Sequence, residues 1–167
     1  RYPGVTAGIE GQSKQSAKTG ISMLRSFAIG LVGVFVLLSF QFRSYLQPLV
    51  VMAVIPLALI GVIWGHLLMG LPLTMPSVIG FTSLSGIVVN DSIILVSFYQ
   101  RLREEGMAVH QALVEAACRR LRAVLLTSLT TIAGLTPLLF ETSLQAQFLI
   151  PMATSIAFGL AFATVLI

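Results

Sequence analysis

Asp91 is the one acidic residue that lies well inside an apolar stretch of the sequence. It follows Pro76 by 15 positions, which corresponds to roughly 22 Å along a helix at about 1.5 Å per residue. If that stretch crosses a bilayer, a carboxylate at this depth costs at least about 2.5 kcal/mol to insert, and desolvation disfavours its charged form. Asp91 is therefore a candidate for the uptake and release of a proton. The alternative is a structural aspartate that finds a partner or reaches the membrane edge.

Asn90 precedes Asp91 in the sequence but lies about 100° away from it on a helix. It belongs to a stripe of small and polar residues formed by Ser83, Gly86, Asn90 and Ser97. Such stripes form contacts between helices more often than they line pathways. From the residue types alone we therefore interpret Asn90 as structural, with a role in chemistry as the alternative.

Arg120 and Thr127 are seven residues apart, which places them two turns apart on one helix face. An arginine at the edge of an apolar stretch is usually a membrane-interface anchor, but such a fixed cation also stabilises a neighbouring carboxylate. His66, at the end of another apolar stretch, is interpreted as a packing or interface residue. The sequence contains no phosphate-binding loop, metal-ligand cluster or nucleophile–base set, so we expect neither an enzyme nor a bound cofactor.

The composition of the chain excludes an ordinary soluble domain. Of its 167 residues, 56% are hydrophobic and 10% are charged, whereas soluble domains carry about 25% charged residues. A disordered chain and a disulfide scaffold are excluded too, because the chain is too apolar for the first and has a single cysteine. The net charge is only +4 and half of the basic residues gather in one segment, so no nucleic-acid partner is expected.

Five apolar stretches are long enough to cross a hydrocarbon core of about 30 Å, which takes about 20 helical residues. They cover residues 21–40, 49–71, 76–99, 123–140 and 148–167. Strands fit poorly, because sustained alternation of polar and apolar residues is lacking. The predicted fold class is all-α: a polytopic transmembrane helix bundle, residues 21–167, embedded in the lipid bilayer. Because both ends of the sequence look cut, we expect a fragment of a larger chain.

The distribution of arginines predicts the orientation of this bundle. Residues 41–48 carry one arginine and residues 100–122 carry five, whereas residues 70–75 and 141–147 carry neither lysine nor arginine. Since short cytoplasmic links are enriched in Lys and Arg, we expect residues 41–48 and 100–122 to lie in the cytoplasm. Residues 1–20, a polar tail that leads from an aqueous domain into the first span, then lie on the opposite side.

The long basic link contains its own helical pattern. Apolar side chains recur there with helical spacing at Val109, Ala112, Leu113, Ala116, Ala117 and Leu121. This spacing predicts an amphipathic cytoplasmic helix at residues 107–118. It lies either along the membrane surface or packed on the bundle as a solvated connector, and neither arrangement gives it a chemical role.

A series of short motifs resembles, in order, the C-terminal half of the resistance-nodulation-division (RND) efflux transporters, the inner-membrane pump subunits of the multidrug type. These motifs are Phe42-Arg43-Ser44-Tyr45, Gly65-His66-Leu67-Leu68-Met69-Gly70-Leu71-Pro72, Ser85-Gly86-Ile87-Val88-Val89-Asn90-Asp91-Ser92, Arg119-Arg120-Leu121-Arg122 and Leu144-Gln145-Ala146-Gln147-Phe148-Leu149-Ile150-Pro151-Met152. The resemblance implies that the five spans are helices eight to twelve of twelve. It also implies that residues 1–20 are the tail of a periplasmic porter domain and its linker.

This resemblance implies proton-driven export of small molecules across the bacterial inner membrane. The pump would be a homotrimer that works with a periplasmic adaptor and an outer-membrane channel, with the proton gradient as its energy source and no cofactor. In the better-studied members, two acids join a lysine, an arginine and a threonine in a proton relay. Asn90 stands at the lysine position, Arg120 at the arginine position and Thr127 at the threonine position. Because Asn90 supplies no cation, we predict a modified relay in which Asp91 pairs with Arg120 or titrates itself.

Two other classes of function stay open at this point. One is a non-efflux member of the same superfamily, either a protein-translocation accessory or a lipid transporter. The other is a structural membrane anchor for an exported domain. An anchor has little need for Asp91 or for the Arg120 and Thr127 face, so replacing these residues separates an anchor from a transporter.

Overall fold

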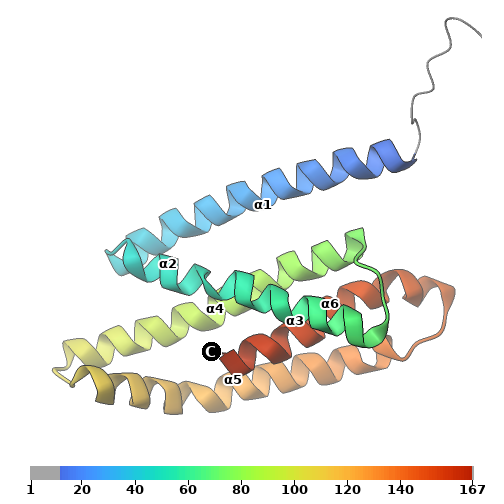
Figure 1. Ribbon diagram of the computed structural model, residues 1–167. Helices are drawn as coiled ribbons and strands as arrows, with labels where there is room; N and C mark the ends of the chain where they lie inside the picture. Colours follow the sequence, from blue (N-terminus) through green and yellow to red (C-terminus); the bar gives the residue numbers. More distant parts are fainter. Residues whose placement is uncertain (1–11, 167) are drawn as a thin grey trace, which may run out of the picture.

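Six helices make up the part of the chain that the computed structural model describes, residues 12–166 (Figure 1). They are α1 (Gln12–Phe42), α2 (Leu46–Met52), α3 (Val54–Met69), α4 (Met75–Glu104), α5 (Val109–Leu139) and α6 (Leu144–Leu166). Because α2 and α3 together form one span, five segments within residues 12–166 are long and apolar enough to cross a membrane. The predicted all-α bundle of five membrane-spanning segments is confirmed.

The first helix extends further toward the N-terminus than the sequence predicted. Residues 12–20, expected to be a linker, form the first turns of α1. Lysine, alanine and glutamine in this segment favour a helix, and no proline or glycine interrupts it before Gly20. Residues 1–11, the rest of the predicted aqueous tail, lie outside the described residues.

The second span bends at Ala53, between α2 and α3. Pro56 is the third residue of α3 and has no N–H to donate to the carbonyl of Met52. The span begins at Leu46, three residues before the predicted start, and ends at Met69. Gly70 closes it in the left-handed conformation, with φ 64°, which a residue without Cβ adopts at little cost.

The structure contradicts the prediction of a separate amphipathic helix at residues 107–118. That segment and the following span form one continuous helix, α5. No glycine or proline occurs in it before Gly134, and Glu115 and Arg119 form an ion pair of 2.6 Å one turn apart. Because nothing interrupts the backbone hydrogen bonds, the amphipathic part continues directly into the apolar part. The α4–α5 link shortens to residues 105–108, where Gly106 adopts φ 87°.

The connections between spans lie at two opposite ends of the bundle (Figure 1). The α1–α2 turn, which contains Arg43, and the α4–α5 link lie at one end, which we call the basic end. The α3–α4 and α5–α6 loops lie at the other, which we call the distal end. Consecutive spans therefore run in opposite directions, as the distribution of arginines requires.

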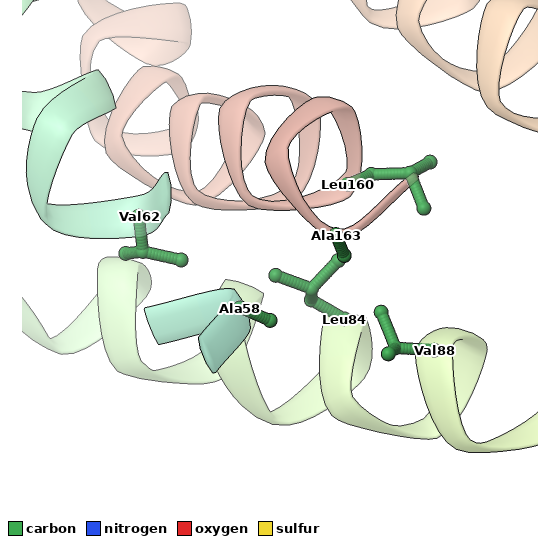
Figure 2. Close-up of a cluster of buried hydrophobic side chains, with 6 residues drawn as sticks. All are labelled: Ala58, Val62, Leu84, Val88, Leu160 and Ala163. Carbon is green, nitrogen blue, oxygen red and sulfur yellow. The ribbon is translucent and has the colours of Figure 1, made fainter. Parts of the chain in front are cut away.

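The innermost core lies where α6 packs against α3 and α4. Six buried side chains from these three helices form it: Ala58, Val62, Leu84, Val88, Leu160 and Ala163 (Figure 2). Gly80 lies so close to α6 that an added Cβ would be 2.6 Å from the carbonyl oxygen of Met152. Lipid tails are as apolar as these side chains, so helix association here depends on close packing and not on burial of apolar surface from water.

Gly80→Ala is expected to destabilise the full-length protein by about 1–3 kcal/mol, the usual cost of overpacking a well-filled core. The new methyl group forces α4 away from the backbone of α6. Thermal unfolding of the purified protein in detergent measures the effect as a lower midpoint. Gly33→Ala on α1 is the matched control, because its added Cβ meets no atom within 4 Å. Equal midpoints for the two variants would contradict the packing argument.

The first helix is the least embedded part of the described chain. Within residues 12–166, α1 contacts α2 and α4 but none of the other helices. Phe27 packs against Phe81 of α4 with 6.0 Å between ring centroids, beside a groove of about 560 Å³ between the two helices. Large apolar side chains cover the outer face of α1, with Phe40 85% exposed. Such a surface is expected against lipid.

Candidate functional site

The carboxylate of Asp91 lies in the half of α4 that approaches the basic end. The residue is 8% exposed, and within residues 12–166 no hydrogen bond or ion pair is made by its side chain. The packing of Val88 and Val89 into the two neighbouring apolar clusters explains its burial, because it turns this part of α4 inward. Asp91 is thus an acid in an apolar setting, as the sequence indicated.

Arg120 is the cation that acts electrostatically on Asp91. It lies on α5, half-buried, and its Nε is buried without a hydrogen-bond partner among the described residues. The two side chains do not approach within the 4.0 Å of an ion pair. The structure therefore brings the predicted acid and the predicted cation within electrostatic range, with a gap between them.

The relative placement of these two residues depends on how α4 and α5 are fixed at the basic end. A small apolar cluster joins the helices there: Leu102, Ala112 and Ala116, with Leu95, Phe98, Tyr99 and Met107 packed around them. The guanidinium of Arg119 also lies over the ring of Phe98, 5.5 Å from its centroid. This contact includes neither Asp91 nor Arg120, but it joins the two helices that carry them.

Asn90 and Thr127 lie on the exposed surface of the described residues. The hydroxyl of Thr127 donates a hydrogen bond of 2.9 Å to the carbonyl oxygen of Ala123, one turn earlier in α5. Neither side chain joins Asp91 and Arg120 in the interior. Of the four predicted site residues, two are therefore near one another and two face outward.

Within residues 12–166, the stripe that contains Asn90 is not buried in a contact between helices. Ser83 and Gly86 are exposed and line the groove between α1 and α4. The face of α4 that packs against α6 carries Gly80 and Leu84 in its place. The physical reason is the size of these residues: glycine allows backbone contact and leucine fills the core, whereas the polar stripe gains nothing from burial there.

Two polar residues beside the predicted site were missed. The hydroxyl of Ser92 is buried next to Asp91 without a hydrogen-bond partner in the described part of the chain. Ser128, next to Thr127, is buried and shares a hydrogen bond of 2.6 Å with Thr164 of α6. The sequence offered one signal for them: each directly follows a predicted site residue, Asp91 or Thr127. However, consecutive residues of a helix point about 100° apart, so this adjacency does not predict burial. The burial of Ser128 depends on the position of α6.

Groups of three or more His, Cys, Asp or Glu side chains that could hold a metal ion do not occur within residues 12–166. The described residues that could take part in proton chemistry are therefore dispersed along the helices. Asp91, which is buried, and Arg120, whose Nε is buried, are the acid and the cation that lie within electrostatic range of each other.

Comparison with known proteins identifies a family for nearly the whole chain. The model of the AcrB/AcrD/AcrF family matches residues 2–167. The cobalt-zinc-cadmium resistance protein CzcA of Cupriavidus metallidurans is 35% identical over 152 residues, which are 91% of this chain and 14% of CzcA. The toluene efflux pump membrane transporter TtgB of Pseudomonas putida is 31% identical over 156 residues, 93% of this chain and 15% of TtgB.

A third relative, the nickel and cobalt resistance protein CnrA of Cupriavidus metallidurans, is 36% identical over 116 residues, 70% of this chain and 11% of CnrA. The chain thus matches only 11–15% of the length of these relatives. The family match and the five apolar spans agree with the motifs in the sequence, and the resemblance is confirmed. The chain belongs to the AcrB/AcrD/AcrF family, the membrane transporters of resistance-nodulation-division efflux pumps.

Proposed function

We propose that this chain is part of a proton-driven transporter that exports small molecules across the bacterial inner membrane, and that Asp91 and Arg120 belong to its proton relay. The observation that carries the proposal is the pair itself. A buried carboxylate without a described partner lies within electrostatic range of a guanidinium whose Nε is buried and unpartnered. Ionisable and unsatisfied groups inside a membrane protein are costly, and they are typical of ion pathways.

Asn90 and Thr127 complete the proposed relay from the outer surface of α4 and α5. Both are polar side chains exposed on an apolar bundle, and polar groups at membrane depth are normally covered by other protein. We infer that a further part of the transporter, which carries the main relay acids, packs over this surface. The relatives are about seven times longer than the matched segment, which leaves ample chain for it.

The wider assembly follows from the same family membership and is part of the proposal. We propose a homotrimer that works with a periplasmic adaptor and an outer-membrane channel. The basic end faces the cytoplasm and the distal end, with residues 1–20, faces the periplasm. The positive-inside rule supports this orientation, because Arg43 and the five arginines of α4 and α5 gather toward the basic end.

Transport by the full-length protein in proteoliposomes tests this function. Because the relatives are named for metal resistance and toluene efflux, the probes are Zn²⁺ and ethidium, an aromatic organic cation. We expect export of at least one probe when a pH gradient is imposed, and loss of that export when nigericin collapses the gradient. Export that continues after collapse contradicts proton coupling. Movement of neither probe contradicts the transporter and favours an anchor.

A further inference from the structure

His66, a buried titratable residue outside the proposed relay, lies near the distal end of α3. Its side chain is 3% exposed. Nδ1 lies 2.9 Å from the carbonyl oxygen of Val62, and Nε2 lies 2.8 Å from the hydroxyl of Ser77 on α4. Because a carbonyl oxygen only accepts, Nδ1 carries the hydrogen. In the neutral ring Nε2 is then the acceptor, and the hydroxyl of Ser77 donates to it.

Ser77 joins the start of α4 to two other helices. Its Oγ accepts a hydrogen bond of 3.1 Å from the backbone N–H of Thr74, the N-cap residue of α4. Its carbonyl oxygen accepts a hydrogen bond of 2.9 Å from the hydroxyl of Ser155 on α6. Ser77 and Ser155 are fully or almost fully buried. One serine thus links the first turn of α4 to His66 of α3 and to α6.

This network suits the neutral imidazole best, because the hydroxyl of Ser77 then accepts from Thr74 and donates to Nε2. A protonated ring has an N–H at Nε2, so the hydroxyl of Ser77 must stop donating to it. The other acceptor in its network is the hydroxyl oxygen of Thr74, at 3.3 Å, which is too long for a good O–H···O hydrogen bond. Protonation therefore reverses this bond, so that Nε2–H donates to the hydroxyl oxygen of Ser77, and it leaves the hydroxyl hydrogen with that weak acceptor.

Among the residues that the structure describes, no carboxylate faces His66 to stabilise its charged form. Neither α3 nor α6 carries another titratable residue, and on α4 the first one after Ser77 is Asp91, about 21 Å further along the helix. Glu141, in the α5–α6 loop, is exposed and accepts hydrogen bonds from the backbone of its own loop. Lys18 and Arg25, the charged residues of α1 whose side chains the structure describes, are positive and exposed. A charged imidazole at this site is therefore uncompensated.

We propose that the His66–Ser77 hydrogen bond is a proton-sensitive contact that holds the distal end of α4 against α3 and α6, and that protonation of His66 releases it. The mechanistic meaning rests on the proposed function. With the distal end in the periplasm, acid outside the cell loosens the start of the helix that carries Asp91. His66 is then a positioning residue for the relay, which acts through the placement of α4.

Hydrogen–deuterium exchange of the full-length transporter in lipid nanodiscs tests this contact directly. The amides of residues 78–82, in the first turns of α4, are compared at pH 8 and pH 5. After correction for the intrinsic rate, exchange should rise about three- to tenfold at pH 5, the factor that corresponds to the loss of one hydrogen bond. If exchange in the wild-type protein does not rise at pH 5, that result alone overturns the proposal.

Three variants assign the effect. His66→Gln has no titratable ring, so the rise at pH 5 should disappear. His110→Gln is the matched control, because His110 is the other histidine of this chain and is exposed on α5; it should keep the wild-type response. Ser77→Ala keeps the imidazole but lacks the hydroxyl, so exchange should already be high at pH 8. A pH response that persists in Ser77→Ala, or in a folded His66→Gln, overturns the proposal.

The same measurements separate this contact from the relay. Asp91→Asn should stop proton-driven export but keep the pH-dependent exchange of residues 78–82. His66→Gln should keep proton-driven export but lose the pH-dependent exchange of residues 78–82. If export does not depend on Asp91 while the exchange responds as expected, the relay is wrong and the contact stands. If the exchange is flat while Asp91 is essential, only the contact is wrong.

Discussion

Asp91→Asn is expected to reduce proton-driven export by the full-length transporter on the order of a hundredfold or more, the lower end of what removal of a proton-transfer group costs. Asparagine keeps the shape of the side chain but carries no titratable proton. The thermal midpoint should stay the same or rise, because a neutral amide avoids the insertion cost of about 2.5 kcal/mol or more that a buried carboxylate carries. Zn²⁺ and ethidium export in proteoliposomes and thermal unfolding in detergent measure the two effects.

The control for this variant is Glu104→Gln, which removes an exposed acid from the last turn of the same helix. It should change export by less than about twofold, since exposed charges contribute little. If Asp91→Asn exports at the wild-type rate at equal expression, Asp91 is a structural residue. If Asp91→Asn loses both export activity and thermal stability, Asp91 instead stabilises the fold by binding a partner group.

Arg120→Gln should lower export about ten- to a hundredfold, which corresponds to roughly 1.4–2.7 kcal/mol of lost electrostatic stabilisation. Arg120→Lys retains the charge and should recover a large part of the activity. The matched control is Arg122→Gln, an exposed arginine two positions further along α5. Equal losses for Arg120→Gln and Arg122→Gln would indicate a general effect of positive charge at the membrane edge.

The double variant tests whether Asp91 and Arg120 act as one unit. If two residues act in one relay, removing the second causes no further loss of export once the first is removed. The double variant Asp91→Asn with Arg120→Gln should therefore export no more slowly than Asp91→Asn alone. Independent roles predict that the two losses multiply. Export rates of the wild type, the two single variants and the double variant give the coupling directly, and a product of the single effects contradicts a shared relay.

The number and approximate place of the spans could be predicted because hydropathy over about 20 residues is sufficient for them. Their boundaries could not. α4 continues to Glu104, beyond the predicted end at residue 99, because arginine and glutamate extend a helix into the aqueous layer. The continuity of α5 was missed for the same reason: the arginines mark the membrane edge, but they do not interrupt a helix.

The burial of individual site residues depends on packing that no local pattern contains. Asp91 and Asn90 are neighbours in sequence, and the rotation of α4 decides which of them faces inward. Close contact between Gly80 and the backbone of α6 sets that rotation. The bond between His66 and Ser77 has a similar origin, because it joins helices across a loop and is supported by Ser155, 78 positions further along the chain.

The unbroken course of α5 has a mechanical consequence. Arg120 divides this rod of 31 residues into an arm of about 17 Å toward the basic end and one of about 29 Å toward the distal end. A tilt centred on Arg120 moves the distal tip nearly twice as far as the basic tip, and in the opposite direction. In the proposed relay, a small displacement of α5 caused by a change of charge at Asp91 would thereby be enlarged where α5 meets the loop to α6, at the distal end.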